Sequence, residues 1–142
     1  MLWKDYNELL LTYEVLGFKK NADFDLSDKE ITMNFGEEKV IYYIIKNTSE
    51  NTLLNIDSIE LRLPKSLELV GMDEAQSSIK DMPGKAQGAF MWTNGPYVLE
   101  QAGELKVAVR VKALASGSDK IVFRVTTLNK YENAPEIAVT VK

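Results

Sequence analysis

Six consecutive apolar residues, Val40 to Ile45, lie between Lys39 and Lys46 in this chain. Because successive side chains of a β-strand point to opposite faces, such a run makes a strand that is apolar on both sides. The run stops at the polar stretch 46–52, and a second apolar segment, 53–63, ends at Leu63-Pro64. This order of apolar strand, polar turn and apolar strand is typical of a β-sandwich.

Alternation of apolar and polar residues predicts further strands. Segments 105–113 and 120–126 both alternate and are separated by the turn residues of 115–119, so we expect them to form an antiparallel hairpin. Segments 31–35 and 136–142 alternate in the same way. Within 53–63 the apolar parity changes near Asp57 and Ser58, which predicts a β-bulge there. The polar, glycine-containing stretch 73–88 is expected to be a loop.

These signals add up to about eight or nine short strands and no convincing long helix, which predicts an all-β, two-sheet antiparallel sandwich. We place this domain at residues 30–142. Residues 1–29 are expected to be an N-terminal extension that packs on the sheet or on a partner. Residues 2–18 could form an amphipathic helix, or a strand over 10–18; Thr12, Tyr13 and Val15 favour the strand.

The composition is that of a folded soluble domain, with 45% hydrophobic and 27% charged residues among 142. The formal charge is −4, without a block of five like charges, so neither nucleic acid nor an anionic membrane is an expected partner. The longest apolar run has six residues, far fewer than the roughly 20 that span a membrane. The N-terminus lacks the pattern of a signal peptide, so we expect either a cytoplasmic protein or a domain of a longer chain.

Two stretches resemble a known family. "GEEKVIYYIIKNTSENTLLNIDSIELRLPKSLELV" (36–70) and "FMWTNGPYVLEQAGELKVAVRVKA" (90–113) are similar to the Ig-like repeat domains of bacterial and archaeal surface proteins, the group of DUF11-type, CARDB-type and NPCBM-associated modules. The resemblance covers 30–142, with a longer loop at 73–88. It implies an Ig-like β-sandwich with a spacer, adhesion or assembly role in a cell-surface or secreted protein; a cytoplasmic location stays open.

The residues needed for several kinds of catalysis are missing. The chain has no histidine and no cysteine, which excludes a Ser-His-Asp triad, a thiol nucleophile and Cys-type zinc sites. Ser77 and Lys80 stand at S-x-x-K spacing, but the accompanying S-D-N and K-T-G elements are absent. We therefore expect no enzymatic activity and no cofactor.

Two candidate ligand sites each have a simpler structural explanation. Asp23, Asp25 and Asp28 supply the oxygen ligands that calcium prefers, although the EF-hand pattern fails; the alternative is a solvated linker. Trp92 and Tyr97 could form an aromatic platform for a carbohydrate; the alternative is a core position for Trp92. A ligand-binding accessory module and a virus or phage structural subunit are thus the alternative functions. Asn47-Thr48-Ser49 is also a glycosylation sequon.

The sharpest expectation concerns the face opposite Ile41, Tyr43 and Ile45. If these three point into the core, then Val40, Tyr42 and Ile44 form an apolar outer face that needs a cover. One candidate cover is the segment 9–18 of the same chain. The other is a protein partner, including a neighbouring copy, through sheet packing or strand addition.

Overall fold

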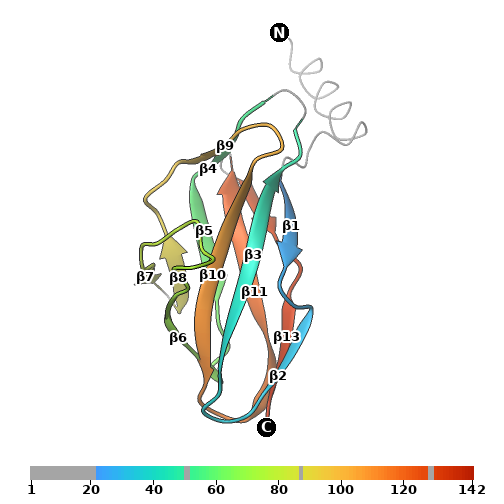
Figure 1. The fold of residues 1–142 in the computed structure, drawn as a ribbon, viewed down its shortest axis with the longest axis vertical. Coiled ribbons are helices and arrows are strands. Elements are labelled where there is room, and N and C mark those ends of the chain that lie inside the picture. The colour runs from blue at the N-terminus through green and yellow to red at the C-terminus, as the bar shows by residue number, and fades with distance from the viewer. Residues whose placement is uncertain (1–21, 50–51, 87, 128–129) are drawn as a thin grey trace, which may run out of the picture.

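The computed structural model describes residues 22–49, 52–86, 88–127 and 130–142, all of which form strands and connecting turns (Figure 1). The expected strand or helix within 1–21 lies outside the described residues. Thirteen strands are present in the described part, more than expected. The expected strand 53–63 is divided in two, and short strands also form at 22–26, 84–86, 97–99 and 130–133, where none was expected.

The strands form two larger sheets and one small sheet. The four-stranded sheet has the order β1 (Ala22–Leu26), β3 (Glu38–Asn47), β10 (Glu104–Ala113) and β6 (Leu67–Met72). The seven-stranded sheet has the order β2 (Glu30–Met33), β13 (Ile137–Val141), β11 (Gly117–Thr127), β5 (Ser58–Arg62), β8 (Ala89–Trp92) and β7 (Gly84–Ala86), and β12 (Lys130–Asn133) also pairs with β11. The small sheet pairs β4 (Leu54–Ile56) with β9 (Tyr97–Leu99).

The two larger sheets pack face to face as a β-sandwich. At the centre of the interface Tyr43 of β3 stacks on Phe123 of β11, with ring centroids 4.2 Å apart and planes 6° from parallel. Ile41 and Ile45 flank Tyr43 on β3 and are fully buried. The core is therefore built from the inward side chains of alternating strands, as the sequence pattern predicts.

The first strand is shared between the sheets. β1 pairs antiparallel with β3, and after a turn β2 pairs parallel with β13 in the other sheet. The order β1-β3-β10-β6 against β13-β11-β5 is consistent with an immunoglobulin-like sandwich, in which strands A, B, E and D face C, F and G. The β7–β8 hairpin is an addition to that plan, since it follows β6 in the chain but pairs with β5.

Three local expectations are wrong. β10 and β11 belong to different sheets and face each other across the core, so they do not form a hairpin. The parity change at Asp57 is no bulge, because the chain leaves the small sheet after β4 and enters the seven-stranded sheet as β5. The 73–88 stretch is not wholly a loop, since it contains β7.

Candidate functional site

The outer face of the four-stranded sheet carries the apolar row that the sequence indicates. Along β3, Ile41, Tyr43 and Ile45 are buried, whereas Val40, Tyr42 and Ile44 point outward and are half-buried. We call this row and the β10 residues beside it, Lys106, Ala108 and Arg110, the Tyr42 face; these are paired with Ile44, Tyr42 and Val40 respectively. The orientation of β3 predicted from sequence is thus confirmed.

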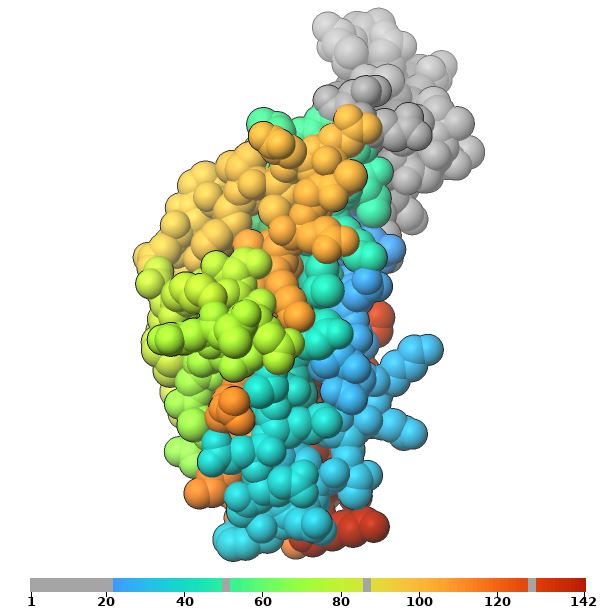
Figure 2. All heavy atoms as spheres, viewed as in Figure 1, coloured from blue at the N-terminus to red at the C-terminus, as the bar shows by residue number. Residues whose placement is uncertain are grey.

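Side chains of the sheet itself cover part of the Tyr42 face. The ammonium of Lys106 lies 4.0 Å from the centroid of the Tyr42 ring, a cation–π contact. Lys106 Nζ also donates a hydrogen bond of 3.2 Å to Gln76 Oε1, in the loop that follows β6. In Figure 2 this loop, in yellow-green, lies over the orange β10 beside the teal β3. Within the described residues no carboxylate lies within ion-pair distance of Lys106.

Ion pairs frame the apolar row. Lys46 pairs with Asp25 of β1 and lies 4.0 Å from Glu104, and its hydrogen bond to Asp25, with the attraction between the two charges, raises the pKa of Lys46. Arg110 lies 3.8 Å from Asp73 at the other side of the face. An apolar centre with a charged rim is the usual anatomy of a protein-binding surface.

The three aspartates proposed as calcium ligands lie on or near β1. Asp23 and Asp25 point outward from this strand, which replaces the linker considered as their alternative, and Asp28 lies 3.9 Å from Lys39. In the part of the chain that the structure describes, no three acidic side chains converge as a metal site would require. Calcium binding at these residues stays a prediction.

Trp92 and Tyr97 occupy different surroundings. Trp92 is 2% exposed, and its Nε1 donates a 3.0 Å hydrogen bond to the carbonyl of Asp81. Tyr97, on β9, is half-buried, and burial raises the pKa of its hydroxyl. The burial of Trp92 favours its core role, because a buried ring offers no face to a sugar; carbohydrate binding stays a prediction.

Ser77 and Asn47 both act as structural hydrogen-bonding groups. Ser77 is 2% exposed, and its Oγ accepts from the backbone N–H of Ala108 at 3.2 Å, while Lys80 donates to the carbonyl of Glu74. Asn47 is 3% exposed, and its Nδ2 donates to the carbonyls of Thr52, Leu99 and Glu100 at 3.0, 3.0 and 3.1 Å. The nitrogen that glycosylation would modify is therefore enclosed in the folded domain.

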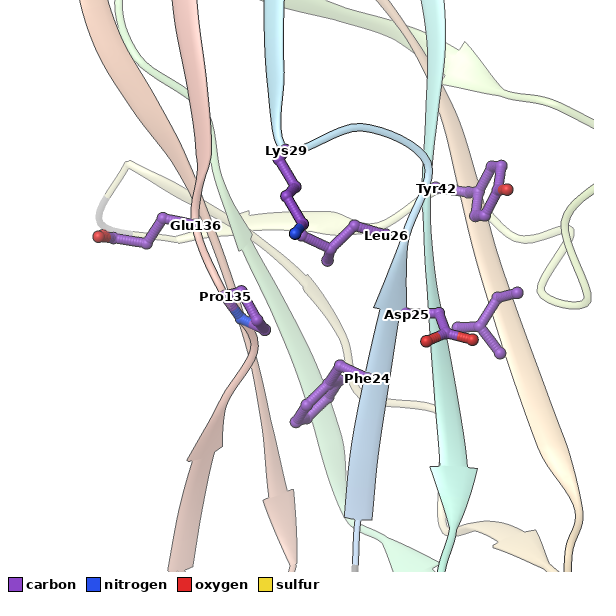
Figure 3. A pocket seen from close by; sticks show the side chains of 8 residues that line it. Phe24, Asp25, Leu26, Lys29, Tyr42, Pro135 and Glu136 are labelled. Atoms are coloured by element: carbon purple, nitrogen blue, oxygen red, sulfur yellow. The ribbon is translucent and has the colours of Figure 1, made fainter.

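A groove of about 490 Å³ lies along β1, between the edges of the two larger sheets. Figure 3 shows Phe24, Leu26 and Lys29 on the side of Pro135 and Glu136, while Tyr42 and Asp25 project to the other side of β1. The groove extends around β1 to the Tyr42 face, because Tyr42 and Ile44 also line it.

Sequence reasoning missed a charged cluster on the outer face of the seven-stranded sheet. The Glu60 side chain is 9% exposed, forms an ion pair with Arg124 and lies 3.4 Å from Arg62 Nε. The guanidinium of Arg124 in turn lies 4.1 Å from the ring centroid of the exposed Tyr131. A signal was available, since Glu60 stands between Ile59 and Leu61 and must point away from the core.

Comparison with known proteins identifies the fold. No family model matches the chain, and no curated protein matches it. Among solved structures, it is similar to a chain of a type I cohesin–dockerin complex from Clostridium thermocellum (TM-score 0.52, 8% identity, 87% of this chain and 100% of that one). It is also similar to the 35 kDa C-terminal fragment of the major pilin GBS80 of Streptococcus agalactiae (TM-score 0.55, 11% identity, 85% of this chain), of which it spans 56%. The cupredoxin domain of amoB from Nitrosocaldus yellowstonii also matches (TM-score 0.48, 13% identity, 87% and 88% covered).

At these identities the matches indicate a common β-sandwich fold and nothing finer. In the described residues, no helix has the length and apolar character needed to cross a bilayer.

Proposed function

We propose that this chain is a non-enzymatic, Ig-like structural and interaction module of a cell-surface or secreted protein. It holds its partners at a fixed spacing and contacts another protein through the Tyr42 face. The resemblance of residues 30–142 to surface repeat domains supports the proposal, as does the fold similarity to a cohesin–dockerin chain and a pilin.

The observation that carries the proposal is the outward row Val40, Tyr42 and Ile44 on a central strand. These side chains stay half-buried although the residues on β1 and β10 beside them are mainly charged. Aromatic side chains at the centre of a rim of charges make large contributions to protein binding. Because Lys106 lies over Tyr42 without a carboxylate partner among the described residues, the expected partner presents apolar groups and a carboxylate.

A neighbouring copy is the first partner to test, by sedimentation velocity over a range of concentrations. The Tyr42→Lys variant places a second ammonium beside Lys106 and should weaken self-association by at least about tenfold. Thr140→Lys is the matched control, because it adds the same charge to an exposed position on β13 in the other sheet. If the wild-type chain is monomeric at high concentration, or if both variants associate like wild type, a neighbouring copy is not the partner of the Tyr42 face.

A further inference from the structure

β6 and β8 lie on the side of the sandwich opposite β1 (Figure 1). Residues of both strands line a second groove there. Its volume is about 500 Å³. Most of its lining is apolar: Leu63, Pro64, Leu67, Leu69, Phe90 and Leu114. Leu69 and Phe90 point inward yet remain half-buried, because no side chain of the described residues fills the space between the two sheet edges.

β6 has a free edge along this groove. It is the last strand of its sheet, and within the described ranges no strand pairs with it on the side away from β10. The N–H of Leu114 donates to the carbonyl of Ser66 at 2.8 Å, which fixes the hydrogen-bonding alternation between the strands. The carbonyl of Leu67 and the N–H of Leu69 therefore point away from β10, toward any strand added at this edge.

Other edge positions of the same sheet are capped by side chains. On β1, the N–H of Phe24 donates to Asp23 Oδ1 at 2.9 Å. On β10, beyond the end of β6, the hydroxyls of Ser77 and Ser78 accept from the N–H groups of Ala108 and Lys106. Such capping blocks the addition of a strand, so the edge of β6 beside its apolar groove is the better site for one.

We propose that the β6 groove binds residues 9–15 of a second copy of this chain as an added strand. In "LLLTYEV" the alternate residues Leu9, Leu11, Tyr13 and Val15 are apolar, which suits insertion of every second side chain between the sheets. The charged residues of the lining are Lys65, Glu68 and Lys85, all exposed, so Glu8 and Glu14 complement its net positive charge. Lys85 Nζ lies 5.7 Å from the Phe90 centroid.

A second copy fits better than the chain's own segment. β1, which residues 1–21 precede, is at the far edge of the sheet from β6, three strand spacings or about 14 Å away. To reach its own β6, the segment would have to cross the Tyr42 face and the loop after β6. The β6 groove is separate from the Tyr42 face, so a peptide-binding assay tests it independently of self-association through that face.

The test measures fluorescence anisotropy of a labelled peptide of residues 8–18 titrated with the full-length protein. Wild type and the Tyr42→Lys variant should bind it alike. Leu69→Glu, which puts a charge in the groove, should bind at least about tenfold more weakly. Val70→Glu is the matched control, because Val70 is 46% exposed on the same strand, and it should bind like wild type.

A charge exchange keeps the test independent of the folding of Leu69→Glu. The double variant Lys65→Glu/Lys85→Glu should weaken binding, and a peptide with Glu8→Lys and Glu14→Lys should restore it. The proposal is overturned if the peptide does not bind wild type, or if Val70→Glu weakens binding as much as Leu69→Glu. If the peptide binds a full-length Leu11→Asp variant but not wild type, and wild type sediments as a monomer at the same concentration, the chain's own segment occupies the groove and the second copy is overturned.

Discussion

The buried hydroxyl of Tyr43 is expected to lower the free energy of unfolding of this domain. Tyr43 is 2% exposed, its ring stacks on Phe123, and its Oη has no hydrogen-bond partner among the described residues. Burial, followed by the negative charge of Glu136, raises the pKa of this hydroxyl well above its ordinary value of 10.0. Replacing Tyr43 with phenylalanine removes the unpaired oxygen and keeps the stacked ring.

The size of the effect follows from the desolvation of that oxygen. A buried polar group without a partner costs about 1 to 3 kcal/mol, so Tyr43→Phe should raise the free energy of unfolding by that amount. For a domain of this length the unfolding entropy converts the gain into a rise in Tm of about 3 to 10 °C. Tyr131→Phe is the control, because Tyr131 is 63% exposed, and it should change stability by less than about 0.5 kcal/mol.

Urea denaturation and calorimetry measure the gain, and alkaline titration supplies a second readout. Above pH 10 the unfolded chain loses the Tyr43 proton while the folded chain retains it, so the free energy of unfolding falls as pH rises. The fall due to this group is up to about 1.4 kcal/mol per pH unit, and the Tyr43→Phe variant should lack it. A variant less stable than wild type at neutral pH would refute the reasoning, since the hydroxyl would then have a stabilising partner.

Two further predictions concern the upper end of the domain and the acidic strand β1. Asn47→Ala removes the amide that joins β3 to the carbonyls of Leu99 and Glu100, and urea denaturation should give a loss of about 1 to 3 kcal/mol; an unchanged midpoint would mean that these contacts do not hold the end together. Calcium should raise Tm by less than about 1 °C, because Lys46 already neutralises Asp25. A rise of several degrees that Asp25→Asn abolishes would instead establish the calcium site.

The sequence predicted which side of each strand is buried better than which strands are neighbours. The alternation along β3 correctly separated Ile41, Tyr43 and Ile45 from Val40, Tyr42 and Ile44, because a period of two reports burial directly. The same signal cannot distinguish a hairpin from two strands that face each other across a core, and the hairpin that it predicts does not form, since β10 and β11 lie in different sheets. Pairing depends on contacts between distant segments, which local alternation does not encode.

The candidate site was predictable to a similar degree. The apolar outer row could be predicted from the sequence, because a strand with one solvated face alternates apolar and polar residues instead of having six consecutive apolar ones. The contact of Lys106 with Tyr42 could not be predicted from the sequence. It depends on the register between β3 and β10 and on Gln76 from a distant loop. The groove beside β6 could not be predicted from the sequence either, because it lies between the edges of two sheets.

The division of the first strand has a mechanical consequence. β2 runs parallel to β13 through four residue pairs, from Ala138↔Glu30 to Val141↔Met33. In Figure 1, β1 lies above β2 and the C-terminus follows β13 at the lower end of the domain, so tension between β1 and the C-terminus pulls β2 and β13 past each other along their length. The backbone hydrogen bonds of the pair then bear the load together instead of opening one after another, so we expect this short parallel contact to resist extension.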